Sequence, residues 1–191
     1  WELGEIILKR PFPLFPEGFP RDLVRRFEEQ AKVKTIGNIA ASGTEIIQRL
    51  GEEHLRAGDI ILYTSADSVF QLAAHEQIIP VERLYEICLI ARALLRDEYG
   101  VGRVIARPFV GEPGNFTRTA RRRDFSLLPP STTFPRAMQE KGHKTLAIGK
   151  IWDLFAEQGF DNQIKTTSND EVMTRIIETS RTDKDHALVF A

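Results

Sequence analysis

The fold class is decided by residues 59–68, which read Asp-Ile-Ile-Leu-Tyr-Thr-Ser-Ala-Asp-Ser. The first six residues are mostly β-branched, aliphatic or aromatic, and they lie between Gly58 and the polar residues that begin at Ser65, so they predict a buried strand. Residues 69–76 are expected to form a short helix directly after this strand. A strand followed by a helix is the repeating step of an α/β protein.

The same kinds of pattern continue on both sides of this stretch. A capping box at Ser42 and Glu45 predicts the start of a helix over 42–50, and the Gly-, Pro- and Arg-rich residues 108–124 predict a long loop outside the core. Pro129 and Pro130 indicate a domain boundary near residue 130. Further helices are expected over 21–30, 81–96, 132–139, 151–157 and 170–179, and strands over 101–109, 144–150 and 188–191.

Composition restricts the classes of function. The 191 residues are 42% hydrophobic and 28% charged, which is typical of a globular chain with a real core. The formal net charge is −1, so no overall field attracts nucleic acid or an acidic membrane surface, and any anion site must be local. No apolar run is long enough to span a membrane. The protein is therefore expected to bind neither nucleic acid nor membrane.

Cysteine and histidine usage argues against redox or metal chemistry within this chain. The single cysteine, Cys88, lies among apolar residues at helical spacing, where a core role is the simpler interpretation and a reactive thiol the alternative. A lone thiol is compatible with a reducing cytoplasm. The histidines His54, His75, His143 and His186 are dispersed without metal-ligand spacing, so no metal site is expected.

The densest polar group follows the predicted strand at Ser65, Asp67 and Ser68. Open α/β sheets bind ligands where strands end, and hydroxyl and backbone N–H groups there suit phosphate, whereas a carboxylate suits sugar hydroxyls. The alternative is that all three residues cap the following helix. Lys150 takes the equivalent position after the strand over 144–150, where it could hold a phosphate or simply lie at the surface.

A second group lies on the predicted strand 101–109. Alternation places Arg103, Ile105 and Arg107 on one face, where two guanidinium groups could bind a phosphate or pair with an internal carboxylate. The run Arg121-Arg122-Arg123 is expected to belong to a solvated or salt-bridged loop. Taken alone, the residues thus indicate an α/β protein with a phosphate- or sugar-binding face and no visible catalytic machinery.

Three strings resemble the phosphopentomutase family. They are residues 63–71 with Ala74-His75-Glu76, residues 102–109 with 111–119, and residues 147–151. The resemblance implies the alkaline phosphatase superfamily and its α/β core. It implies that 11–129 form an α+β cap domain for substrate recognition, and that 1–10 and 130–191 are fragments of the core.

The resemblance also implies site roles. Arg103 and Lys150 would hold the phosphate that is not transferred, Ser65 and Asp67 would contact the sugar, and Val69 and Ile105 complete the substrate contacts. The site would then close between two domains. Residues 121–125 depart from the family's usual Asn-Arg-His-Asp-Tyr string, so Arg121, Arg123 and Phe125 receive no role.

The activity implied by the resemblance is an isomerase of nucleoside catabolism in the cytoplasm. It interconverts ribose 1-phosphate and ribose 5-phosphate, and their deoxy analogues, through a phosphothreonine, with two Mn²⁺ ions and a glucose or ribose bisphosphate activator. The nucleophile and metal ligands would lie in core segments absent from this chain, whose two ends look cut, so the piece alone is expected to be inactive. The alternatives are a related sugar-phosphate mutase or phosphatase, or a stand-alone sugar-phosphate-binding module.

Overall fold

The computed structural model describes residues 2–191 and separates into two compact units. The larger unit is Phe12–Leu127, and the smaller unit combines residues 2–11 with Leu128–Ala191. Strands and helices occur in both, which confirms the α/β class. The assignment of 11–129 as a cap and of 1–10 and 130–191 as core fragments stays a prediction.

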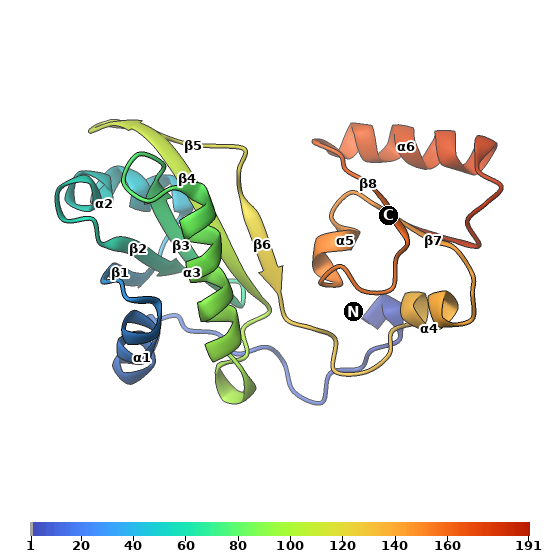
Figure 1. Cartoon of the computed structure of the whole chain (residues 1–191), viewed down its shortest axis with the longest axis horizontal. Helices are drawn as coiled ribbons and strands as arrows, with labels where there is room; N and C mark the ends of the chain where they lie inside the picture. Colours follow the sequence, from blue (N-terminus) through green and yellow to red (C-terminus); the bar gives the residue numbers. More distant parts are fainter. Residues whose placement is uncertain (1) are drawn as a thin grey trace. The chain divides into compact units, whose positions relative to one another are not determined.

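A six-stranded mixed sheet forms the centre of the larger unit (Figure 1). Its order is β1-β2-β3-β4-β5, with β6 also paired to β4. β1 is parallel to β2 and β3 is parallel to β4, whereas β2 and β3, β4 and β5, and β4 and β6 pair antiparallel. The strands are β1 (Thr35–Ala40), β2 (Ile60–Thr64), β3 (Val69–His75), β4 (Arg103–Glu112), β5 (Asn115–Arg118) and β6 (Arg123–Ser126).

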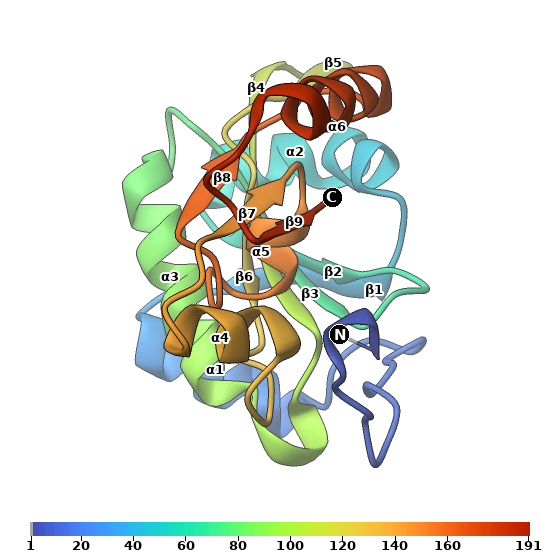
Figure 2. The same ribbon diagram turned by 90° about the vertical axis from the view of Figure 1, so that its right-hand side faces the viewer.

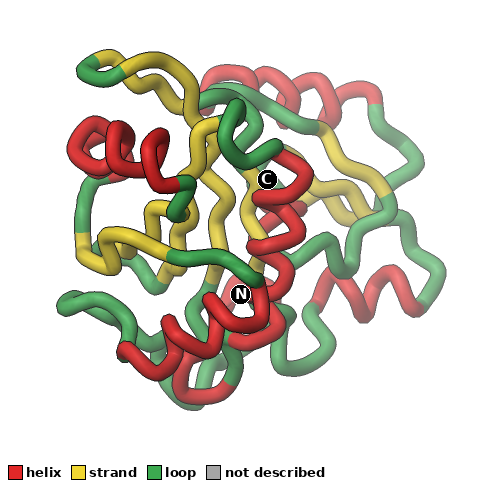
Figure 3. Tube along the Cα trace, turned by 60° about the vertical axis from the view of Figure 1, so that its left-hand side comes forward, coloured by secondary structure: helices red, strands yellow, loops and turns green. Residues whose placement is uncertain are grey.

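Helices cover the two faces of this sheet unequally (Figure 3). The helices α1 (Arg21–Ala31) and α3 (Val81–Leu94) pack on one face, where their apolar stripes meet side chains such as Phe70, Leu72 and Val104. Helix α2 (Gly43–Ala57) packs on the other face against Ile61, Tyr63 and Phe109. Cys88 is fully buried on the α1/α3 side, which confirms its core role.

The α2 side also buries two histidines, His54 and His75. His54 Nε2 accepts the backbone N–H of His75 at 2.8 Å, so Nδ1 carries the proton that binds the Asp59 carbonyl at 2.7 Å. His75 Nε2 lies 3.1 Å from the Gly111 carbonyl. Burial lowers the pKa of His54, because desolvation disfavours the charged imidazole. Both rings therefore serve as structural hydrogen-bonding groups.

The smaller unit contains a three-stranded parallel sheet in the order β8-β7-β9, with helices around it (Figure 2). The parallel strand-helix alternation predicted here is confirmed. Phe155 and Phe160 pack with Ala147 in its core, and Ser168 caps α6 by accepting the Glu171 N–H at 3.2 Å. The elements are η1 (Glu2–Gly4), α4 (Phe134–Glu140), β7 (Thr145–Ile148), α5 (Ile151–Leu154), β8 (Asn162–Ile164), α6 (Asn169–Thr182) and β9 (Leu188–Phe190).

The expected helix over 69–76 is wrong, because Val69–His75 form strand β3. This strand lies between β2 and β4 and is buried along its whole length. A strand covered on both faces reads as a continuous apolar run, and such a run cannot be told from a short buried helix by its period. Ser65, Asp67 and Ser68 therefore belong to a turn between antiparallel strands, and the helix-cap interpretation of these residues is wrong as well.

The loop expected over 108–124 is also wrong. The end of β4, all of β5 and the beginning of β6 lie there. Phe116 packs edge-on against Phe109 and is buried, while its neighbours in β5 are exposed. One inward residue among several polar ones is enough to anchor an edge strand. The strands β1 and β8 were also not predicted, because Gly37 and Asn38 interrupt the apolar residues of β1 and β8 has only three residues, two of them polar.

Ser42 precedes α2 as expected but forms no capping hydrogen bond. Its hydroxyl instead lies 3.0 Å from the Thr44 hydroxyl. The first residue of the helix is Gly43, and a Cβ placed there would lie only 2.7 Å from the Tyr63 hydroxyl oxygen. Glycine thus lets the amino end of α2 approach the sheet face beside Tyr63.

Candidate functional site

The turn between β2 and β3 presents two of the predicted residues. Ser65 is half-buried, and the side chain of Asp67 is 75% exposed with its carboxylate 3.8 Å from the Arg103 guanidinium. Ser68 is tied to the backbone, since its hydroxyl donates to the Pro13 carbonyl and accepts the Gly102 N–H. Ser65 and Asp67 are therefore accessible to a ligand, whereas Ser68 holds the turn in place.

Strand β4 places Arg103, Ile105 and Arg107 on one face, as alternation predicts. Val104 and Ala106 point to the opposite side, into the apolar cluster under α1 and α3. Arg103 Nη1 lies 3.3 Å from the Asp124 carboxylate, and 24% of the Arg103 side chain remains exposed. Arg107 donates from Nε to Gln71 at 3.2 Å, and burial lowers the pKa of its guanidinium. The anion and internal-carboxylate interpretations of Arg103 are compatible, because Asp124 leaves part of it open.

Two apolar residues complete the predicted set on this sheet. Val69 begins β3 and pairs with Arg103 in the register, and Ile105 pairs with Gln71 two residues further along. Both side chains are 2% exposed. They can thus offer a ligand only the edge of an apolar surface or their backbone groups.

Sequence reasoning missed three other groups near this face, namely Tyr63, Arg118 and Arg122. Burial raises the pKa of the Tyr63 phenol, against the opposing effect of the Arg107, Arg118 and Arg122 guanidinium groups. The Tyr63 hydroxyl has no hydrogen-bond partner among residues 2–191. Arg122 binds Asp124 with two hydrogen bonds. These residues come from β2, β5 and the segment before β6, and only the pairing of the whole sheet brings them together, because they are distant in sequence.

Arg121 and Arg123, the other residues of the run 121–123, contact neighbouring side chains. Arg121 pairs with Glu76 at 3.1 Å, and the Arg123 guanidinium lies over the rings of Tyr85 and Phe125 on the α3 side. Phe125 itself belongs to the apolar cluster there. The salt-bridged interpretation of Arg121 and Arg122 is confirmed, although they flank a strand rather than lie in a long loop.

Lys150 belongs to the smaller unit, where it follows β7 and precedes α5. It lines a cavity of about 390 Å³ at the carboxyl ends of the parallel strands. The loop from Thr166 to Ser168 and the start of α6 form another wall of this cavity. This is the edge at which open α/β sheets bind ligands, as the sequence predicted for Lys150.

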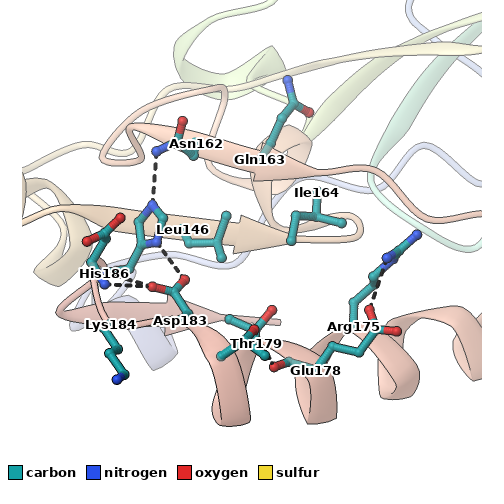
Figure 4. Close-up of a pocket in the computed structure, with 12 residues that line it drawn as sticks. Leu146, Asn162, Gln163, Ile164, Arg175, Glu178, Thr179, Asp183, Lys184 and His186 are labelled. Carbon is teal, nitrogen blue, oxygen red and sulfur yellow. Dashed lines mark hydrogen bonds and ion pairs between the residues drawn. The ribbon is translucent and has the colours of Figure 1, made fainter.

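A larger cavity of about 670 Å³ lies between β8, Leu146 of β7 and the second half of α6 with the loop after it (Figure 4). His186 Nδ1 lies 2.6 Å from the Asp183 carboxylate, and Asn162 donates to His186 Nε2 at 2.9 Å. Backbone N–H groups of His186 and Asp185 lower the pKa of Asp183. None of the predicted site residues lines this cavity.

Neither a metal cluster nor a membrane helix is found among residues 2–191. No three His, Cys, Asp or Glu side chains in that range gather in a way that could hold a metal ion. No helix in that range has the length and apolar character needed to cross a membrane.

Comparison with known proteins finds similarity to phosphopentomutases over nearly all of the chain. No protein-family model matches the chain. It is 54% identical over 178 residues to the phosphopentomutase of Caldanaerobacter subterraneus, which covers 93% of this chain and 45% of that protein. The phosphopentomutases of Acetivibrio thermocellus and Clostridium novyi are 52% and 50% identical, over 96% of this chain and 47% of each protein.

The share of sequence that is matched differs between this chain and its relatives. The chain spans about half the length of the curated relatives it matches, while the relatives match nearly all of the chain. An alignment over 183 of the 191 residues spans the strands and turns that carry Ser65, Asp67, Arg103 and Lys150. Over nearly its whole length, the chain is a homologue of the phosphopentomutases.

Proposed function

We propose that this chain is the substrate-recognition part of a phosphopentomutase that interconverts ribose 1-phosphate and ribose 5-phosphate, and the deoxy analogues. The observation that carries the proposal is identity of 50–54% to curated phosphopentomutases over 93–96% of the chain. The open face of β4 supports it, since a partly exposed arginine beside a half-buried one suits a dianionic phosphate.

The proposed roles follow from the chemistry of each group. Arg103 binds the phosphate that is not transferred, because its guanidinium can donate two parallel hydrogen bonds to phosphate oxygens. Arg107 adds positive charge from the same face. Asp67 and Ser65 bind the sugar hydroxyls, and Val69 and Ile105 form the apolar boundary beside them. Lys150 contributes a cation in its own unit. Hydroxyl-to-carboxylate and guanidinium-to-phosphate pairing would set the orientation of the sugar phosphate.

We assign phosphoryl transfer itself, with its metal ions and nucleophile, to parts of the polypeptide other than residues 2–191. The described residues provide no cluster that could hold a metal. Bound metals would supply electrostatic stabilisation of the transferred group. A sugar bisphosphate activator would use the same arginine-rich face, because it carries the same phosphate group.

The test is turnover by the protein encoded by the complete reading frame that contains this chain. Ribose 1-phosphate is supplied with Mn²⁺ and a trace of glucose bisphosphate, and formation of ribose 5-phosphate is followed. The 191-residue chain is assayed beside it. We expect turnover only by the complete protein. A folded, metal-loaded complete protein that acts on another sugar phosphate, or on none, would overturn the assignment in favour of a related mutase, a phosphatase or a binding module.

A further inference from the structure

Asp124 of β6 lies beside the Arg103 face of β4 and, among the ion pairs found in residues 2–191, is the one carboxylate that holds two arginines at once. Arg122 donates to it from Nε at 2.6 Å and from Nη2 at 2.7 Å, and Arg103 Nη1 lies at 3.3 Å. Only 6% of the Asp124 side chain is exposed. A carboxylate this deeply buried requires cationic partners, and here it has two.

The sheet register explains why Asp124 reaches Arg103. Asp124 pairs with Ile105 across the β4–β6 ladder, and Arg103 pairs with Ser126 two residues away. Diagonal neighbours on one face lie within reach of long side chains. Asp124 therefore reaches Nη1 of the Arg103 guanidinium, while 24% of the Arg103 side chain remains exposed.

The charges near Asp124 show that it does not neutralise the face. Arg103, Arg107 and Arg122 lie near it, and Asp67 adds one exposed carboxylate at 3.8 Å from Arg103. Three cations thus face two carboxylates. Without Asp124, the guanidinium groups of Arg103 and Arg122 would repel each other, and each would lose its fixed partner. The carboxylate keeps the two cations close in a defined arrangement.

We propose that Asp124 is a positioning residue for phosphate binding: it fixes the Arg103 guanidinium so that the outward N–H groups meet the substrate phosphate. This inference rests on the proposed function. It also predicts the direction in which removal of the carboxylate changes phosphate binding. A carboxylate that merely competed with phosphate for Arg103 would weaken binding, and its removal would strengthen it. A carboxylate that orients Arg103 has the opposite effect, because a mobile guanidinium loses its two-bond geometry.

The experiment uses Asp124→Asn in the complete protein, which preserves the shape of the side chain and removes its charge. We expect the KM for ribose 5-phosphate to rise about tenfold while kcat changes less than about threefold, as for loss of one oriented charge-assisted contact. Asp22→Asn in the first turn of α1 is the matched control, since that exposed carboxylate lies on another element. The control should leave both constants unchanged.

A double variant tests whether Asp124 acts through Arg103. In an Arg103→Ala background, Asp124→Asn should add little further loss, because the residue that it positions is already gone. Additive effects would overturn the inference. If Asp124→Asn does not fold, Arg122→Lys keeps the charge but loses the two-bond contact to Asp124, and we expect a KM rise of about threefold.

The outcomes separate the two proposals. Absence of turnover by the wild-type protein would overturn the proposed function. Wild-type turnover with an unchanged or lower KM in Asp124→Asn would overturn the positioning role alone. Wild-type turnover with a raised KM, a preserved kcat and no further loss in the double variant would support both.

Discussion

The two faces of strand β4 differ in what they bury. Towards α1 and α3, Val104 and Ala106 join an apolar cluster that also holds Cys88. Towards α2, the same strand presents Arg103, Ile105 and Arg107, and the residues buried on that side include His54 and Tyr63. The α1/α3 face buries apolar side chains, whereas the α2 face combines a smaller apolar cluster with buried polar and charged side chains. The difference shows that a single strand can carry both the core and the candidate site.

The largest expected effect comes from placing one carboxylate on each face. Val104→Asp would bury an unpaired charge under α1 and α3 and should destabilise the larger unit by about 4 kcal/mol. Ile105→Asp places the same group between two arginines and should cost about half as much, because guanidinium partners are near. Urea unfolding of both variants measures the difference. Equal losses would show that the two faces do not differ in this way.

Removing the exposed arginine should affect binding more than stability. Arg103→Ala in the complete protein should lower kcat/KM for ribose 5-phosphate by about 30- to 1,000-fold, which corresponds to about 2–4 kcal/mol. The melting temperature should change less, because Arg122 still pairs with the buried Asp124 carboxylate. Arg25→Ala is the matched control, because Arg25 is exposed on α1 and, within residues 2–191, forms an ion pair only with Glu29. Unchanged kinetics for Arg103→Ala would remove this residue from the site.

Acid should lower the free energy of unfolding through His54, which is buried on the α2 side. The pKa of His54 is lowered in the folded state, so the neutral ring favours folding. Its contribution is complete above the unfolded pKa of about 6.5 and is lost as pH falls from there towards the folded pKa, by up to about 1.4 kcal/mol per pH unit. Urea unfolding between pH 8 and pH 5 measures this loss.

The control for this prediction compares two histidines. His54→Gln should flatten the pH dependence between pH 6.5 and pH 5, whereas His143→Gln at an exposed position should leave it unchanged. An identical pH dependence in wild type and His54→Gln would show that His54 is not the group that titrates on unfolding.

The smallest effect concerns Cys88. Burial raises the pKa of its thiol, because the apolar surroundings disfavour the thiolate. A thiol reagent should therefore leave the native chain unmodified at pH 8 and react fully in 6 M urea. Rapid labelling of the native chain would show that the α1/α3 side opens readily.

Sequence patterns predicted the features that depend on local period. Alternation placed Arg103, Ile105 and Arg107 on one face, and the spacing in 81–96 identified the buried side of α3 with Cys88. Patterns failed where burial removed the period, as in β3, which is covered on both faces. They failed too where an edge strand has a single inward residue, as with Phe116 in β5.

The contacts of Asp124 were beyond sequence reasoning for a different reason. Asp124 and Arg103 are 21 residues apart, and no local spacing relates them. Their contact depends on the register between β4 and β6, which follows from packing of the whole sheet. Lys150 could be placed at a strand end from its sequence, because that position follows directly from the pattern of β7 and α5.

The most direct test of the account is to map ribose 5-phosphate on the two faces of β4. Methyl groups of isoleucine and valine are labelled in the complete protein, and their NMR signals are followed as ribose 5-phosphate is added. The account predicts that the signals of Ile105 and Val69 shift, while that of Val104 stays in place. Shifts confined to Val104 and its neighbours under α1 and α3, or no shift at a saturating concentration, would contradict it.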